Sequence, residues 1–318
     1  MARYGITIPF DGVTLVEHRE WYARLADLGY TDVWSSEVDG TDGFTPLALA
    51  AAWEPRLSLG VAVAPVFTRG PGLLAMTAAA AADAAPGRFT LGIGASSQPV
   101  VERWNGVTYD KPFARTRDTL RFVKRALAGE KVDEAFETFT VRGFRLGRPV
   151  DSPPPILLGA LRPSMLRLAG READGAILNW LGAGDVARCC EQVGEGKTIA
   201  ARIFVVPTED EGLARAVARR MISSYLTVEA YAEFHRWLGR AEALGPMWEA
   251  WAAGDRKLAN EVIPDEVVDE LVVHGSYDEC REHVARYVAA GVNVPVLAVV
   301  PVVDLAEAVA GLAPTGIP

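Results

Sequence analysis

The stretch Val294-Pro-Val-Leu-Ala-Val-Val300, near the end of the 318-residue sequence, is an uninterrupted apolar run. A strand without polar alternation is typical of a parallel sheet covered by helices on both faces, because neither face of such a strand meets water. Residues 277–290, just before this run, carry apolar side chains at the three- and four-residue spacings of an amphipathic helix. The chain is therefore predicted to be built from helices followed by buried strands.

The same unit recurs along the chain. Eight segments are strand candidates with helical patterns between them: residues 4–8, 32–36, 57–64, 89–93, 156–158, 175–178, 199–206 and 294–300. A further short extended segment is expected at residues 270–273. This pattern favours an α/β fold, a closed (β/α)8 TIM barrel with insertions, over the alternative of an open doubly wound sheet. In a barrel, the functional residues are expected just after the C-terminal end of each strand.

Two segments interrupt this regularity. Residues 131–154 have the character of a hairpin or an extended excursion, and residues 209–262 form a helical insertion that carries Trp237, Trp248 and Trp251. We expect residues 1–318 to form a single barrel domain with these two insertions. The second insertion is interpreted either as a lid over an apolar pocket or as ordinary helix packing or a subunit contact.

The composition excludes several classes of protein. Hydrophobic residues make up 50% of the chain and charged residues 23%, which argues against intrinsic disorder. The formal net charge of −9 argues against a general affinity for nucleic acid or an anionic membrane surface. No secretory signal is visible, the apolar tract at residues 73–85 is too short for a membrane span, and Cys189, Cys190 and Cys280 form no CxxC pair. We expect a cytoplasmic protein.

Signatures of the common nucleophile and metal enzymes are missing. There is no GxSxG, no HExxH and no Cys/His cluster, so no metal site is predicted. The histidines are scattered, none is expected at the C-terminal end of a strand, and His18 and His283 are predicted to be exposed on helices. The stretch Leu91-Gly-Ile-Gly-Ala-Ser-Ser-Gln98 lacks the third glycine of a dinucleotide fingerprint, and Pro99 follows it instead of a helix. It is interpreted equally as a surface for close approach of a planar ligand or as a plain strand exit.

Three other strand ends carry polar or turn-forming residues. Glu37 follows the second strand, either as a functional carboxylate or as part of a surface loop. Gly159-Ala160 leads through Arg162 into a helix that opens with proline, and free N–H groups at such a helix start suit a phosphate. Asn179 and Trp180 end the next strand, where an amide and an indole are placed to frame a ligand, although a barrel-rim aromatic is the simpler interpretation of Trp180.

Several motifs taken together resemble those of a known family. They are Pro86-Gly-Arg-Phe-Thr-Leu-Gly-Ile-Gly94 followed by Ser96-Ser97 and Val101-Glu-Arg-Trp-Asn-Gly106, then Leu28-Gly-Tyr-Thr-Asp-Val-Trp-Ser-Ser-Glu37, and Pro155-Ile-Leu-Leu-Gly-Ala160. In these motifs the chain is similar to the luciferase-like monooxygenase superfamily, and most of all to the branch that uses the deazaflavin coenzyme F-420 rather than FMN. The resemblance covers most of the chain, and residues 209–262 are its least diagnostic part.

The resemblance implies a (β/α)8 barrel that binds its coenzyme at the C-terminal mouth and transfers hydride to or from C5 of that coenzyme. In the family, the third strand carries a bulge, often with a non-prolyl cis peptide, that supports the ring; the matching stretch here is Val61-Ala-Val-Ala-Pro65. The phosphate and acidic tail of such a ligand suit the helix start at Pro163. The residues thereby expected to bind the coenzyme are Val63, Ala64, Ser96, Ser97, Gly159, Ala160, Asn179 and Trp180.

One departure from the family pattern bears on the reaction. Members that oxidise alcohols or sugar phosphates place a histidine after the second strand, where this chain reads Ser36-Glu37-Val38, and a carboxylate is missing at Ser97. Glu37, Ser97 and Glu102 are therefore the candidate catalytic residues. Reduction of an activated C=C or C=N bond in a small organic substrate is favoured over alcohol oxidation.

Other interpretations stay open. An FMN-dependent monooxygenase that uses reduced flavin and oxygen is the main alternative function. A barrel that has lost catalysis and serves as a binding protein is a third. The resemblance and the alanine-rich helical faces favour a homodimer, and neither nucleic acid nor a membrane is expected as a partner.

Overall fold

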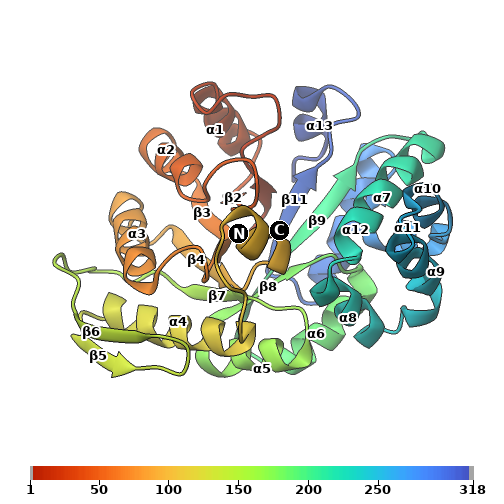
Figure 1. Ribbon diagram of the computed structural model, residues 1–318. Helices are drawn as coiled ribbons and strands as arrows, with labels where there is room; N and C mark the ends of the chain where they lie inside the picture. Colours follow the sequence, from red (N-terminus) through yellow and green to blue (C-terminus); the bar gives the residue numbers. More distant parts are fainter. Residues whose placement is uncertain (1–2, 315–318) are drawn as a thin grey trace.

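The strands of the computed structural model, which describes residues 3–314, close into a ring. All of them are parallel and pair in the order β1-β2-β3-β4-β7-β8-β9-β11, and β11 returns to β1 (Figure 1). Their bounds are β1 (Gly5–Thr7), β2 (Asp32–Ser35), β3 (Ser58–Pro65), β4 (Phe89–Gly94), β7 (Ile156–Gly159), β8 (Gly175–Asn179), β9 (Thr198–Val206) and β11 (Val294–Val299). Each end lies within a residue of the strand expected from the sequence, and the (β/α)8 barrel is confirmed.

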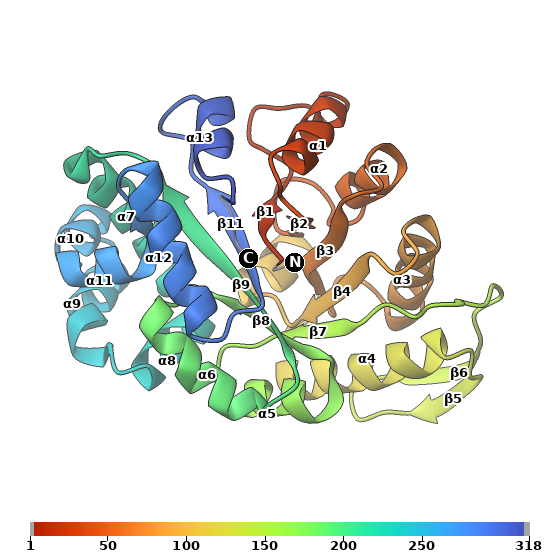
Figure 2. The same ribbon diagram turned by 180° about the vertical axis from the view of Figure 1, so that it is seen from behind.

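Helices connect the strands and cover the outside of the ring (Figures 1 and 2). The helices packed around the barrel are α1 (His18–Asp27), α2 (Thr45–Trp53), α3 (Pro71–Ala84), α4 (Pro112–Leu127), α5 (Pro163–Glu172), α6 (Val186–Val193), α12 (Tyr277–Ala289) and α13 (Leu305–Gly311). Proline stands in the first turn of α2, α3, α4 and α5, where its missing N–H has no helical partner to lose. The main core lies between these helices and the ring, and a smaller cluster around Trp34, Leu157 and Val296 fills the barrel interior.

The two insertions take different positions. Strands β5 (Val132–Ala135) and β6 (Thr140–Phe144) form an antiparallel hairpin beside α4 (Figure 1). Residues 209–262 contain four helices: α7 (Glu211–Leu226), α8 (Glu229–Trp237), α9 (Ala241–Ala252) and α10 (Arg256–Glu261). Their buried side chains share a second core with Trp180, Phe204 and Ala298, which lie at the C-terminal ends of β8, β9 and β11. The helical insertion therefore packs firmly over part of the barrel mouth, and lid motion stays a prediction.

Three local expectations are wrong. A single π-helical turn, η1 (Pro99–Trp104), follows β4 where no helix was expected. Residues 270–273, expected to be extended, contain the end of α11 (Asp265–Leu271), and the two-residue strand β10 (Val273–His274) comes after it. His274 thus ends a short strand that pairs with β9, contrary to the expectation for the histidines. Hydrophobic periodicity needs longer segments than these to identify an element.

His18 is also placed differently from the expectation. It opens α1 and is fully buried rather than exposed. Its Nε2 accepts a hydrogen bond from the N–H of Phe10 at 2.9 Å, and its Nδ1 lies 2.8 Å from the carbonyl oxygen of Thr14. Burial of the imidazole is tolerated because both ring nitrogens have partners.

No helix formed by residues 3–314 has the length and apolar character that a bilayer crossing needs. Within the same residues, no group of three or more His, Cys, Asp or Glu side chains is placed to hold a metal ion. Cys189, Cys190 and Cys280 are free thiols.

Candidate functional site at the barrel mouth

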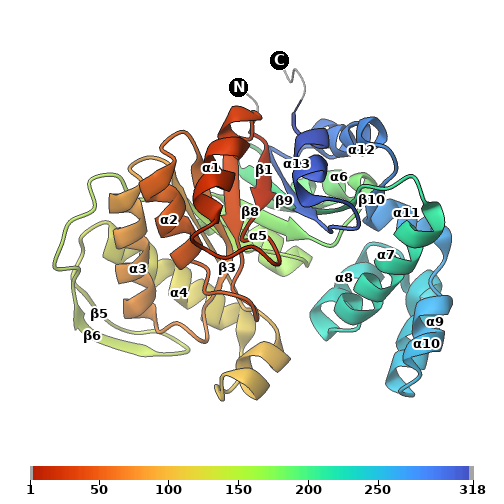
Figure 3. The same cartoon turned by 90° about the horizontal axis from the view of Figure 1, so that it is seen from above.

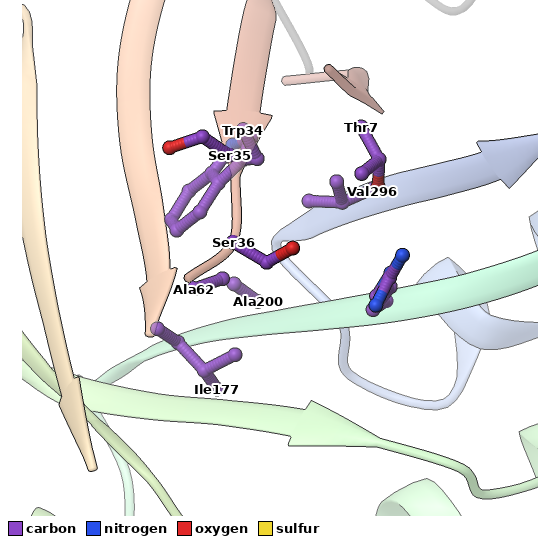
Figure 4. A pocket seen from close by; sticks show the side chains of 9 residues that line it. Thr7, Trp34, Ser35, Ser36, Ala62, Ile177, Ala200 and Val296 are labelled. Carbon is purple, nitrogen blue, oxygen red and sulfur yellow. The ribbon is translucent and has the colours of Figure 1, made fainter. Parts of the chain in front are cut away.

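A small pocket lies inside the barrel towards the C-terminal ends of the strands. Its volume is about 10 Å³, enough for one water molecule or a single polar group of a ligand. The residues that line it are Thr7, Trp34, Ser35, Ser36, Ala62, Ile177, Ala200, Arg202 and Val296 (Figure 4). This pocket forms the floor of the mouth, and the two sides of the mouth differ in chemistry.

Strand β3 carries the bulge that the family resemblance implies. Its pairing with β4 shifts register between Val61 and Ala64, and the Ala62–Val63 peptide bond is cis. Val63 is partly exposed, whereas Ala64 is fully buried. Of the two residues expected to bind the coenzyme on this strand, Val63 therefore offers its side chain to the mouth and Ala64 packs behind it.

Two glycines extend this surface onto the neighbouring strands. A Cβ at Gly94 would lie 2.8 Å from Cγ2 of Val63, and a Cβ at Gly159 would lie 3.1 Å from Cγ1 of Val63. Glycine at both positions lets the Val63 side chain lie against the ends of β4 and β7. We call Val63, Gly94 and Gly159 the glycine wall; it is a low apolar surface without a charged side chain.

The side of the mouth that follows β7, formed by β8, β9 and α8, is polar. Arg202 of β9 pairs in register with Asn179 of β8 and lines the floor pocket, and its guanidinium carbon lies 4.9 Å from the ring centroid of Phe204. Asn179 Nδ2 donates a hydrogen bond of 2.9 Å to the hydroxyl oxygen of Tyr231, in the first turn of α8. We call Asn179, Arg202 and Tyr231 the polar wall.

Several buried polar atoms around the mouth have no hydrogen-bond partner within the described residues 3–314. They are Thr7 Oγ1, Trp34 Nε1, Asn179 Oδ1 and Arg202 Nε. Each unpartnered buried polar atom costs about 1–3 kcal/mol. Their concentration around one pocket indicates a surface prepared for a polar ligand.

Trp180 does not frame this pocket with its indole. The residue is 1% exposed, and its ring stacks on Phe204 with centroids 4.1 Å apart, in the core shared with the helical insertion. Nε2 of the buried His235 lies 2.9 Å from the carbonyl oxygen of Trp180. The φ of Trp180 is 55°, in the left-handed region, which is costly for a bulky residue. Trp180 thus supports the polar wall from behind, and only its backbone is placed to meet a ligand.

Glu37 is held in an ion pair at the rim of the mouth. Arg69 donates to its carboxylate from Nε at 2.9 Å and from Nη2 at 2.7 Å, and the N–H of Gly43 donates at 2.9 Å. The Glu37 and Arg69 side chains are only 17% and 16% exposed. These bonds tie the loop after β2 to the loop after β3, so they favour a positioning role. A catalytic role for Glu37 stays a prediction.

Ser96, Ser97 and Glu102 lie in the loop and π-helical turn after β4. Ser96 adopts a φ of 61°, and its carbonyl oxygen accepts a hydrogen bond of 3.3 Å from the hydroxyl of Tyr109. Glu102 accepts hydrogen bonds from the N–H of Tyr109 at 3.0 Å and from Nε2 of Gln98 at 2.7 Å, and both lower the pKa of its carboxyl group. A carboxylate held ionised is a poor proton donor at neutral pH. Ser97 is partly exposed, and the catalytic roles of Ser97 and Glu102 stay predictions.

The start of α5 has the form expected from the sequence. Ala160 is buried in the turn before it, and no side chain caps the first helical turn after Arg162. Pro163 has no N–H, and the N–H of Met165 donates to the carbonyl oxygen of Arg162 at 3.0 Å, so the N–H of Ser164 is the one available to an anion. Burial raises the pKa of Tyr109, while Arg162 lowers it and Glu229 of α8 raises it. Tyr109 lies in the loop after β4. Figure 3 shows that loop, in gold, projecting from the same side of the barrel as α8, α9 and α10.

Trp34, Arg202 and Tyr231 were not identified as site residues from the sequence. Arg202 carried a signal, because it is the only charged residue in the strand candidate at residues 199–206. Tyr231 carried none, since it reaches the mouth from an insertion. Which face of an inserted helix meets the barrel is decided by its packing.

Residues 3–293 match the model of a family described as luciferase-like monooxygenase. The chain belongs to this family. A candidate coenzyme F-420-dependent oxidoreductase of Mycobacterium tuberculosis is 30% identical to this family member over 88% of this chain and 90% of the relative. The 5,10-methylenetetrahydromethanopterin reductase of Methanolobus tindarius is 24% identical over 91% of this chain and 92% of the relative. An F-420-dependent glucose-6-phosphate dehydrogenase of Beutenbergia cavernae is 34% identical over 43% of each chain.

Solved structures share the fold of this luciferase-like protein. The coenzyme F-420-dependent tetrahydromethanopterin reductase of Methanopyrus kandleri superposes with a TM-score of 0.79 at 19% identity, over 98% of this chain and 97% of the other. An F-420-dependent secondary alcohol dehydrogenase superposes with a TM-score of 0.78 at 16% identity, over 97% of this chain and 96% of the other.

Proposed function

We propose that this family member is a coenzyme F-420-dependent oxidoreductase that transfers a hydride between the coenzyme and a small organic substrate. The observation that carries the proposal is the similarity, over 88% of this chain and 90% of the relative, to a protein named for that coenzyme. The relative from Methanolobus tindarius, similar over 91% of this chain, is a reductase. Our finer proposal is reduction of an activated C=C or C=N bond, since Ser36-Glu37-Val38 follows β2 in place of a histidine.

The glycine wall and the start of α5 fit such a coenzyme. Val63 lying across Gly94 and Gly159 makes a surface that a planar ring can cover without displacing a longer side chain. The uncapped start of α5 suits a phosphate, with Arg162 beside it. When bound, the coenzyme supplies the carbon that carries the hydride. The residues proposed to hold it are Val63, Ala64, Ser96, Ser97, Gly159, Ala160, Asn179 and Trp180, the last through its backbone.

The protein's own side chains have to orient the substrate, exclude water and supply a proton. The helical insertion and the loop after β4 flank the mouth and would limit access of water (Figure 3). Glu37, Ser97 and Glu102 stay the catalytic residues predicted from the sequence. Tyr231 joins them, because burial raises the pKa of its hydroxyl and keeps it protonated, and its oxygen already accepts a hydrogen bond from Asn179.

Titration of the purified protein with coenzyme F-420 and, separately, with FMN tests this proposal. We expect changes in coenzyme absorbance and fluorescence with F-420 and none with FMN at the same concentration. Reduced F-420 should then be oxidised in the presence of members of an acceptor panel rich in activated C=C and C=N bonds. Tight binding of FMN without any response to F-420 would overturn the proposal in favour of an FMN-dependent monooxygenase.

We also propose that the protein acts as a homodimer. Light scattering in dilute buffer should then give twice the monomer mass of 34.2 kDa. A mass equal to the monomer at micromolar concentration would contradict it.

A further inference from the structure

We propose that the substrate carries a carboxylate group and that Arg202 of β9 binds it. The inference rests on the proposed function for the reaction and on the polar wall for recognition. Arg202 lines the floor pocket of the mouth. Within residues 3–314, its Nε is buried without a hydrogen-bond partner.

Arg202 differs from other arginines that are mostly buried. Arg69 pairs with Glu37 at 2.7 Å, and Arg240 pairs with Asp185 at 2.9 Å. Arg202 forms no such ion pair with the described residues, and Phe204 offers it only a cation–π contact at 4.9 Å. Arg202 is partly exposed, and its Nε is the buried atom that lacks a partner among residues 3–314. An acidic ligand would pair with this guanidinium and satisfy that Nε, despite the net charge of −9 on the whole chain.

The groups around Arg202 include two hydrogen-bond donors, from Trp34 and Tyr231, and one unpartnered acceptor, Asn179 Oδ1, on the neighbouring strand. Trp34 Nε1 lines the same pocket and is buried without a partner among residues 3–314. The Tyr231 oxygen accepts from Asn179, which leaves its hydroxyl hydrogen available to a ligand. Two neutral donors beside a guanidinium suit an acceptor group with negative charge. A carboxylate has the two oxygens that match the planar fork of a guanidinium.

Arg202 of the polar wall lies across the barrel from Val63 of the glycine wall, whereas Gly159 on β7 and Asn179 on β8 stand on neighbouring strands. Strand β9 is four strands away from β3 in either direction around the closed ring. A coenzyme ring seated on the glycine wall therefore leaves Arg202 facing the substrate side of the mouth. A substrate carboxylate on Arg202 places the rest of that molecule between the two walls, beside Tyr231.

A calorimetric titration of the whole protein with benzoate, and with benzamide as its neutral analogue, tests the proposal. We expect benzoate to bind at least about tenfold more tightly than benzamide, and Arg202→Gln to weaken benzoate binding about 10- to 100-fold with little change for benzamide. Arg202→Lys, which keeps the charge but loses the fork, should fall between the two and serves if the glutamine variant does not fold. Arg19→Gln, on the exposed surface of α1, is the matched control and should bind benzoate like the wild type.

Titration of the same variants with coenzyme F-420 separates this inference from the proposed function. Normal F-420 binding with equal affinities for benzoate and benzamide would overturn the carboxylate site and leave the proposed function standing. Loss of F-420 binding in Arg202→Gln would assign Arg202 to the coenzyme and also overturn it. If the wild type binds no F-420, the proposed function fails, and a preference for benzoate that depends on Arg202 would still support the carboxylate site.

Discussion

The glycine wall and the polar wall of the same barrel mouth are built in opposite ways. The glycine wall has one valine side chain lying against two strand ends, with no charged group. The polar wall holds Arg202, Asn179 and Tyr231, and two of these residues keep a buried atom without a partner among residues 3–314. A flat apolar wall suits a planar coenzyme, whereas a charged wall selects among substrates. We therefore assign the coenzyme ring to the glycine wall and the choice of substrate to Arg202 and Tyr231 of the polar wall, while Asn179 stays among the residues proposed to hold the coenzyme.

The two walls also differ in what supports them. The glycine wall stands on the barrel strands β3, β4 and β7. The polar wall depends on the second core, in which helices of the insertion pack against Trp180 and Phe204. Changes in residues 209–262 should therefore alter substrate selection more than coenzyme binding.

Bulk added to the glycine wall should have the largest effect. In Gly159→Val, the new Cβ would lie 3.1 Å from Cγ1 of Val63 and push that side chain into the space proposed for the ring. We expect affinity for F-420, measured by fluorescence titration, to fall about 100-fold, equivalent to about 2.8 kcal/mol, with little loss of stability. Gly147→Val is the control, because a Cβ there meets nothing within 4 Å. Unchanged affinity would remove this turn from the coenzyme site.

Replacing Glu37 by a neutral residue tests the role of its ion pair with Arg69 at the rim of the mouth. Glu37→Gln removes the charge from a carboxylate that accepts bonds from Arg69 and Gly43, so we expect the free energy of unfolding in urea to fall by about 2 kcal/mol. Turnover should fall no more than coenzyme affinity does. A fall in turnover at unchanged affinity would instead support the catalytic role predicted for Glu37 from the sequence.

Low pH should destabilise the fold around His235, which contacts the carbonyl oxygen of Trp180 behind the polar wall. Burial, together with the charge of Arg240, lowers the pKa of His235 from 6.5 to about 3, and the hydrogen bond with the carbonyl group of Trp180 opposes this shift. Because the folded pKa lies below the unfolded value, the stabilisation is complete above about pH 6.5 and is lost as the pH falls towards about 3. Between these pH values, we expect the contribution of His235 to the free energy of unfolding to fall by about 1.4 kcal/mol for each unit by which the pH is lowered. Urea titrations at several pH values measure this dependence. The free energy of unfolding should change less with pH in His235→Gln than in the wild type. An identical pH dependence in the two proteins would show that His235 is not the group responsible.

Removing the charge of Arg202 should have the smallest effect on stability, and it should stabilise the protein instead of destabilising it. Arg202→Met replaces a guanidinium that lacks an ion-pair partner among residues 3–314, so we expect the free energy of unfolding to rise by about 1 kcal/mol. The melting temperature measures it. Arg69→Met, which breaks the ion pair with Glu37, should destabilise the protein and is the matched comparison. A destabilised Arg202→Met would show that the folded protein already compensates this charge.

Much of the glycine wall could be predicted from the sequence. The strand ends were located to within a residue, and the family resemblance placed the bulge at residues 61–65 and the turn at Gly159. The exceptions are local. His18 follows the helical pattern but is buried, and the η1 turn is too short to leave a periodic signal. That residues 1–318 behave as a single domain stays a prediction.

The amino-acid sequence alone is enough to predict the barrel, because a buried parallel strand is apolar throughout its length and a helix repeats its apolar face every three to four residues. The family was predicted from the resemblance of its motifs. These signals are local, so they can be recognised in the sequence without knowledge of the fold. The partners of the polar side chains depend on the folded chain. Glu37 meets Arg69, and Asn179 meets Tyr231 on a helix 52 residues away, only because packing brings strand ends and insertion together. No local pattern in the sequence predicts such a contact. Of the polar wall, Asn179 was therefore predicted from the sequence, whereas Arg202 and Tyr231 were identified only in the structure.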